Sequence, residues 1–357
     1  MNNRIEKCIE VMKHKNIEAL LLNSEENVRY ITGFTGDSSW ALITYENTYL
    51  FTDGRFIEQA KNECEGVQSF LWQNPGRPDP KTIEYYLKLN NINNVGFEAE
   101  KMSYGIYSKL IENISKVSWI GINNIVEDLR SVKDLYEREC LLEACRIADK
   151  GLEKILPLIK IGATEKDIAN ELVYAMKKEG AEKEGFDTIC ISGKKTSMPH
   201  GQPDNKKIQK GDFLTIDFGA LYKGYTSDMT RTFVIGKASE EQIEVYNLVK
   251  EAQKRAVESI KSGIKANIPD IEVRKVFGDK YIKYYYPGMG HGVGLFLHEK
   301  PFISINSEDI IKEDTIMTVE PGLYIPNWGG VRIEDCVHVT KDSAKLLTHF
   351  DRNLIEL

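Results

Sequence analysis

The stretch DFGALYKGYTSD, residues 217–228, has an acidic residue at each end. The segments on either side, FLTI and MTRTFVI, are apolar, aromatic and β-branched, and Lys223-Gly224 favours a turn, so this region predicts a β-hairpin. A tip at Tyr222 and Lys223 would place Asp217 directly opposite Asp228. Opposed carboxylates destabilise a sheet, so the arrangement requires a positive charge between them.

A second acidic pair, Glu320 and Glu334, flanks the loop 321–330 between predicted strands at 315–319 and 331–340. The neighbouring residues, which include Ile316 and Ile333, are too apolar for a solvated face, and buried unpaired carboxylates are costly. A single acidic pair could equally be surface acids on a β-ribbon. Two pairs in one domain favour a buried site.

His291 lies in the glycine-rich stretch GMGHGVG, where the backbone can approach a ligand closely. The stretch does not fit GxGxxG and no strand-to-helix unit surrounds it, so a dinucleotide site is not indicated. Two divalent cations would neutralise the four carboxylates. Oxygen donors with one imidazole and no thiolate suit manganese, with cobalt, zinc or iron as alternatives. Two such metals share a hydroxide and polarise a carbonyl, which is the chemistry of hydrolysis.

The composition describes an ordinary globular chain of 357 residues with a net charge of −7, long enough for about two domains. Its lysines form no basic stripe, so a nucleic-acid partner is not expected. The six cysteines show no CxxC spacing and the N-terminus shows no signal-peptide pattern, which favours a cytoplasmic location. No apolar run approaches the ~20 residues of a membrane span.

The order of helical and strand patterns predicts an α+β chain of two domains. Short apolar runs alternate with turns and helical patterns through residues 1–125, which indicates a small α/β domain. We expect a linker at 126–134. Residues 135–357 then form the second domain, with helices after Thr164 and Ser239 as caps, followed by runs of antiparallel strands.

Several motifs occur in the order and spacing of a known family: SMPHGQP, DFGALYKGYTSDMTRTF, GHGVGLFLHEKP, TVEPGLYIP and GVRIEDCVHVT. The chain resembles the Xaa-Pro metallopeptidases, aminopeptidase P and prolidase, whose catalytic domain has the pita-bread fold. The N-terminal NVRYITGFTGDSSWALI and FTDGRF resemble the creatinase-like domain that precedes it. The resemblance covers nearly the whole chain and implies a homodimer.

The resemblance also implies a role for each site residue. Asp217 would hold one metal, Asp228 and Glu334 would bridge both, and His291 and Glu320 would hold the other. Glu320 would also orient or deprotonate the water between the metals. The histidine that contacts the scissile peptide corresponds to His298, the one at the far side of the substrate to His200, and the nearby cation to Arg332.

Two features of the site remain open at the sequence level. Arg332 could hold a ligand carboxylate in place, or its guanidinium could clamp the free carboxylate of a dipeptide. The histidine that the family usually has four residues before its metal-binding histidine is replaced by Pro287, so any proton relay through that position is in doubt. The five proposed ligands are unaffected.

The implied activity is hydrolysis of the bond between an N-terminal residue and proline, in peptides or dipeptides, through attack by a hydroxide shared between two metals. An X-Pro bond has no N–H and a fixed ring, so it requires a dedicated pocket. Alternatives are a methionine aminopeptidase or another aminopeptidase without proline specificity, against which the long N-terminal domain argues. A creatinase-like hydrolase or a metal-free binding module is a further alternative, but such relatives usually lose the carboxylates.

Overall fold

The computed structural model describes residues 2–72 and 79–357, which form two compact units. The units are Met1–Arg130 and Ser131–Leu357, so the division lies inside the stretch 126–134 that we expected as a linker. Among the described residues, no helix combines the length and the apolar character that crossing a membrane requires.

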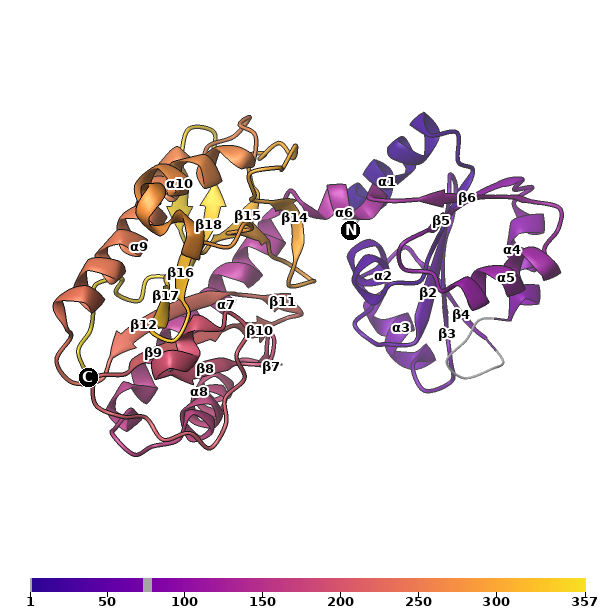
Figure 1. The fold of residues 1–357 in the computed structure, drawn as a ribbon. Helices are drawn as coiled ribbons and strands as arrows, with labels where there is room; N and C mark the ends of the chain where they lie inside the picture. Colours follow the sequence, from indigo (N-terminus) through magenta and orange to yellow (C-terminus); the bar gives the residue numbers. More distant parts are fainter. Residues whose placement is uncertain (1, 73–78) are drawn as a thin grey trace. The chain divides into compact units, whose positions relative to one another are not determined.

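The first unit is a mixed six-stranded sheet with helices around it (Figure 1). The strand order is β4-β3-β2-β1-β5-β6, and β1 runs antiparallel to β2 but parallel to β5. Every side chain of β1, β2 and β3 is buried, as their apolar runs predict. The elements are α1 (Asn2–His14), β1 (Ala19–Leu22), α2 (Glu25–Thr32), β2 (Ser39–Thr44), β3 (Thr48–Thr52), α3 (Ile57–Glu63), β4 (Gln68–Leu71), α4 (Pro80–Leu89), β5 (Asn94–Glu98), α5 (Tyr104–Asn113), β6 (Ser118–Ile122) and α6 (Ile125–Arg130).

The second unit begins with two packed helices, α7 (Leu135–Ile155) and α8 (Glu165–Glu179). Asp134 caps α7, and the predicted Thr164 caps α8 by accepting the backbone N–H of Asp167. Antiparallel strands follow, and β8, β9 and β12 form a three-stranded sheet. The strands are β7 (Lys183–Glu184), β8 (Ile189–Ser192), β9 (Phe213–Phe218), β10 (Ala220–Tyr222), β11 (Tyr225–Thr226) and β12 (Met229–Val234).

The same order, two helices and then antiparallel strands, occurs again in the rest of the unit. Ser239 caps α9 (Glu240–Ser259) as predicted, and α9 packs on α10 (Asn267–Tyr281). Five strands form one sheet in the order β14-β13-β15-β18-β19, while β16 and β17 pair separately. Their bounds are β13 (His291–Gly292), β14 (Glu299–Phe302), β15 (Ile316–Val319), β16 (Gly322–Ile325), β17 (Gly329–Arg332), β18 (Asp335–Val339) and β19 (Ala344–Leu346).

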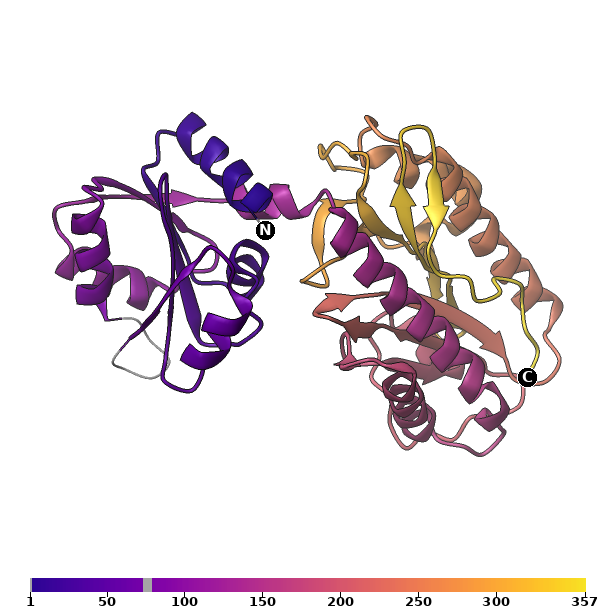
Figure 2. The ribbon, with the colours of Figure 1, turned by 180° about the vertical axis from the view of Figure 1, so that it is seen from behind.

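Two of the apolar clusters in the core of this unit join its helices to its strands. In one, α9 and α10 pack against the strands of the second half, and the cluster includes Val249, Phe277, Val319 and Val337. In the other, α7 and α8 pack against β8, β9 and β12, and the cluster includes Leu172 and Ile216. Figure 2 shows α7 lying across the face of the strands. The strands that carry the acidic residues are therefore fixed by helices from both halves.

The hairpin that carries Asp217 has a different register from the predicted one. Its turn residues are Lys223 and Gly224, which have φ of +47° and +78°, and Tyr222 pairs with Tyr225. Positive φ at both central residues is the geometry that suits a two-residue hairpin turn. Asp217 therefore lies opposite Thr230, and the predicted direct pairing of Asp217 with Asp228 is wrong. Asp228 lies two residues before Thr230, diagonal to Asp217.

Candidate metal centre

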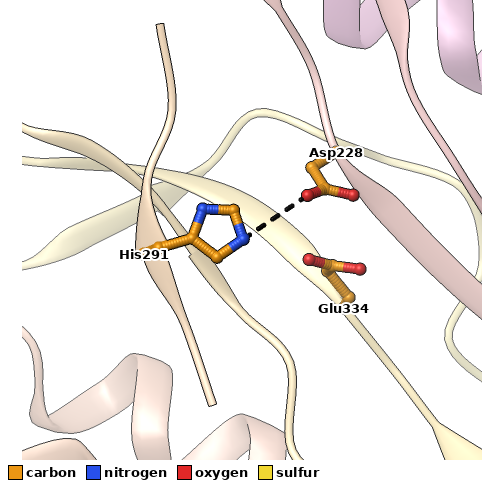
Figure 3. A group of neighbouring side chains, drawn as sticks. All are labelled: Asp228, His291 and Glu334. Atoms are coloured by element: carbon orange, nitrogen blue, oxygen red, sulfur yellow. Dashed lines mark ion pairs between the residues drawn. The ribbon is translucent and has the colours of Figure 1, made fainter. Parts of the chain in front are cut away.

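Five side chains that the sequence singles out come together from five strands of the second unit, on the strands or directly beside their ends. Asp217 lies on β9 and His291 opens β13, whereas Asp228 directly precedes β12, Glu320 follows β15 and Glu334 precedes β18. One ligand atom from each of Asp228, His291 and Glu334 lies within 4.8 Å of the other two. Figure 3 shows the imidazole of His291 directed toward the two carboxylates.

A break in the second hairpin exposes Glu320 and Glu334 to the same space. Val319 pairs with Asp335 in β15–β18, and Gly322 pairs with Arg332 in β16–β17. Both pairings follow the same register, which places Glu320 opposite Glu334 in the gap between these two strand pairs. Their backbone N–H groups donate elsewhere: Glu320 to the Met289 carbonyl at 2.9 Å and Glu334 to the Thr230 carbonyl at 3.1 Å. The hairpin with acids at both ends that the sequence predicts is thus present.

Three oxygens at this site lack any hydrogen-bond partner among the described residues although they are buried. They are Asp217 Oδ1, Asp228 Oδ1 and Glu334 Oε1. Buried carboxylate oxygens require a partner, because desolvating them without one is costly. Hard oxygen donors together with one imidazole are a suitable donor set for divalent cations. The residues present therefore fit a metal centre.

Burial and mutual repulsion dominate the electrostatics of these acids. Burial raises the pKa of Asp228 well above the ordinary carboxyl value, and the charges of Glu334 and Asp217 raise it further. Burial likewise raises the pKa of Glu334 strongly, with the charge of Glu320 as the next cause. Burial would also raise the pKa of Glu320, but His291 in its protonated form, the charge of Arg332 and the hydrogen bond from Thr318 together lower that pKa. Positive charge at this site would stabilise the ionised forms.

Hydrogen bonds fix His291 in the form that a metal ligand needs. Its Nδ1 lies 3.1 Å from the carbonyl oxygen of Gly292, which can only accept, so Nδ1 carries the proton. The free Nε2 then lies 3.3 Å from Glu320 Oε1 and 3.6 Å from Asp228 Oδ2. The backbone N–H of His291 donates to Thr318 Oγ1, which itself donates to Glu320 at 3.1 Å.

Arg332 is buried behind the acids and holds several of their neighbours. Its Nη2 lies 2.6 Å from Asp217 Oδ2, its Nη1 donates to the Tyr324 hydroxyl at 2.7 Å, and its Nε donates to Thr230 Oγ1 at 3.1 Å. Thr230 in turn donates to Glu334 Oε2 at 2.6 Å. The sequence analysis missed Thr230 and Tyr324. A signal existed for Thr230, because it lies two residues after Asp228 and so shares its strand face.

The acids open into a cavity of about 530 Å³ whose lining residues all belong to the second unit. His200 and His298 both line it, and the His298 ring lies 4.4 Å from the His291 ring. Pro287 also lines the cavity, together with Tyr286 and Tyr324, whose ring centres are 5.6 Å apart. The structure thus brings all eight predicted site residues to one cavity. Their individual roles remain proposals.

Comparison with known proteins places this geometry in a family. The family model described as metallopeptidase family M24 matches residues 139–341, and the creatinase/prolidase N-terminal domain matches residues 4–132. The chain belongs to metallopeptidase family M24. It is 38% identical to an Xaa-Pro dipeptidase of Pyrococcus horikoshii, over 99% of both chains.

Solved structures of an Xaa-Pro dipeptidase and an X-Pro aminopeptidase share the fold along the whole chain. An Xaa-Pro dipeptidase from Bacillus anthracis superposes with a TM-score of 0.96 at 37% identity, and an X-Pro aminopeptidase from Thermotoga maritima with 0.90 at 33% identity. Each comparison covers 99% of both chains. These findings confirm the predicted fold class, a creatinase-like domain followed by a pita-bread domain. They also confirm that the chain is a prolidase-like hydrolase, and membership of the family implies divalent metal ions.

Proposed function

We propose that this M24 peptidase hydrolyses the bond between an N-terminal residue and proline, using two divalent ions held by Asp217, Asp228, His291, Glu320 and Glu334. The observation that carries the proposal is a set of three buried carboxylate oxygens, on residues that line the cavity, for which no described residue provides a hydrogen-bond partner. The relatives named Xaa-Pro dipeptidase and X-Pro aminopeptidase support the choice of substrate. When bound, two divalent ions would lower the pKa of a water molecule between them and polarise the scissile carbonyl.

Glu320 is the residue best placed to receive a proton from the attacking water. Its Oε1 is engaged by the Thr318 hydroxyl and faces His291, which leaves Oε2 for the transfer. Burial opposes the ionised form of Glu320, whereas the positive charge of Arg332 and the hydrogen bond from the Thr318 hydroxyl favour it, and both contacts persist when His291 is a neutral ligand.

His298 and His200 would contact the substrate from the cavity wall. No hydrogen bond joins the His298 ring to any other described residue, and the ring is open to the cavity. It can therefore donate to the carbonyl oxygen as negative charge develops there. The adjacent rings of Tyr286 and Tyr324 offer an apolar face to the proline ring, which has no N–H to satisfy.

The contacts of Arg332 favour a supporting role for this residue. Besides its bonds to Asp217, Tyr324 and Thr230, its Nη2 donates to the Pro199 carbonyl at 3.3 Å, so the guanidinium is already surrounded by acceptors. We infer that Arg332 holds Asp217 in position and does not clamp a substrate carboxylate.

Three further features belong to the proposal on the strength of the family resemblance and the composition. The metal is manganese, with cobalt, zinc or iron as alternatives, because the donors are hard oxygens with one imidazole. The assembly is a homodimer in which the N-terminal domain of one chain helps to close the site of the other. The cell compartment is the cytoplasm. Metal analysis of protein purified without added metal, light scattering and fractionation test these three features.

A metal-replacement assay with matched peptides tests the proposed activity. The protein is stripped with a chelator, resupplied with manganese, cobalt or zinc, and assayed on Leu-Pro, Leu-Pro-amide, Leu-Pro-Ala and Leu-Ala. We expect no activity without metal, restoration by two ions per chain, and cleavage of the proline substrates only. Full activity of the stripped protein, or equal rates on Leu-Ala, would reject the proposal. The ratio of Leu-Pro to Leu-Pro-Ala rates separates dipeptidase from aminopeptidase.

A further inference from the structure

One buried ion pair in the second unit lies next to the site yet contains no proposed ligand. Lys133 Nζ lies 2.8 Å from Glu299 Oε2, and the two side chains are 0% and 5% exposed. Glu299 directly follows His298 in the chain. A buried ion pair is weak evidence for stability, since apolar residues often serve as well. Its place beside His298 therefore calls for a functional explanation.

The loop that carries His298 closes around the Glu299 carboxylate. Glu299 Oε1 accepts the backbone N–H of Phe296 at 3.0 Å. A Cβ on Gly294 would lie 2.7 Å from the same carboxylate, so glycine allows this close approach. The loop 293–298 is thus folded over one carboxylate, and Lys133 contacts that carboxylate from outside the loop.

Lys133 itself is held by rigid neighbours. Its backbone N–H donates to the Asp314 carbonyl at 2.9 Å. The next residue, Asp134, caps α7 through reciprocal bonds with Glu137. The ammonium group is therefore presented from a fixed backbone, on the segment 131–134 that opens the second unit.

The position of the His298 ring depends on the Lys133–Glu299 ion pair more than the position of the His291 ring does. His291 has hydrogen bonds at both its backbone N–H and its ring. The His298 ring has only a ring contact with His291 among the described residues, so the loop backbone decides where its nitrogens point. We propose that Lys133 is a positioning residue for His298, acting through Glu299, a role that rests on the proposed function of His298 at the scissile carbonyl.

The test measures whether Lys133 acts only through His298. In the wild type, K133M should lower kcat about 10- to 100-fold on Leu-Pro, with KM and bound metal unchanged, because a misplaced group costs rate without a lost contact to substrate. In an H298A background the same change should add less than about 2-fold, since coupled residues are not additive. Amide exchange in 293–299 should become faster. K265M, which breaks the exposed Lys265–Glu308 pair, is the matched control and should leave all four readouts unchanged.

The inference would be overturned if K133M lowered kcat by the same factor in the H298A background as in the wild type. It would also be overturned if K133M were as active as the wild type. K133M removes the ammonium group that lies against the buried Glu299 carboxylate, so the paired variant K133M/E299Q guards against simple unfolding. A folded paired variant with lowered kcat supports the role, and one with native kcat overturns it. Unfolding of both variants would also overturn it, because the pair would then hold the fold itself. A wild type inactive on proline peptides would instead reject the proposed function.

Discussion

The negative charge of Asp228 should destabilise the metal-free protein but stabilise the metal-bound protein. One of its oxygens is buried without a partner among the described residues, and the nearby charges of Glu334 and Asp217 oppose its ionisation. A metal ion would turn the same charge into a favourable contact. Metal-free protein should therefore carry a strain that a neutral side chain of the same shape removes.

D228N tests this reversal. Without metal, the variant should unfold at a higher temperature than metal-free wild type, since one of several crowded like charges is gone. With metal, the variant should bind fewer than two ions per chain, and its kcat should fall more than about 100-fold. That loss exceeds the one expected when a residue that only hydrogen-bonds to a metal ligand is replaced. Calorimetry and metal analysis give both results. D342N, at an exposed acid, is the control, and a lower metal-free unfolding temperature for D228N would contradict the argument.

Arg332 allows a second test at the residue scale. Lysine cannot reproduce the planar set of contacts to Asp217, Tyr324 and Thr230. R332K should therefore lose about 1.5 to 3 kcal/mol in kcat/KM, the value of a hydrogen bond to a charged group. If the arginine only supports Asp217, the loss should be equal on Leu-Pro and Leu-Pro-amide. A loss confined to Leu-Pro would show that it clamps the free carboxylate.

At the scale of elements, the strands that carry the acids approach each other closely at one glycine. A Cβ on Gly219 would lie 1.9 Å from the Ser227 carbonyl oxygen. Gly219 comes between the end of β9 and the start of β10, and Ser227 directly precedes Asp228. The spacing of Asp217 and Asp228 therefore depends on the missing side chain.

G219A should force these strands apart. We expect a loss of about 1 to 3 kcal/mol in unfolding free energy, the usual cost of overpacking, together with weaker metal binding. Chemical denaturation and metal titration measure the two effects. G105A is the matched control, because a Cβ there meets nothing within 4 Å and alanine favours the helix α5. A G219A variant with native stability and metal affinity would show that the strands can move.

The sequence predicts element types, and which side chains share the cavity, better than it predicts register and distant contacts. Thr164 and Ser239 are caps as their types and places indicate. The hairpin tip is misplaced by one residue because Lys223 adopts a positive φ, which a side chain of its type rarely does. Lys133 is missed because it meets Glu299 only through tertiary structure, and no local pattern marks that contact.

At the scale of the whole molecule, each unit has an apolar core of its own. In the first unit Leu42, Phe51 and Val95 are packed together, while all eight predicted site residues belong to the second. Binding of metal should therefore stabilise the two units unequally.

Amide exchange with and without manganese measures this difference. At metal concentrations about 100 times the dissociation constant, strands of the second unit should gain about 2.7 kcal/mol of protection. Strands β1, β2 and β5 of the first unit should change little. Magnesium at the same concentration is the control for ionic strength. Equal gains in both units would show that they unfold as one.

The division of the metal centre between two halves of the second unit has a consequence during biosynthesis. Asp217 and Asp228 follow the first helix pair, whereas His291, Glu320, Glu334 and Arg332 all follow the second. Domains fold in the order in which the ribosome delivers them. A nascent chain that has reached α10 already contains both aspartates, but neither Arg332 nor the imidazole exists yet. If these residues hold two ions as proposed, loading of the metal pair would be a late event, because it would have to wait until synthesis has passed Glu334.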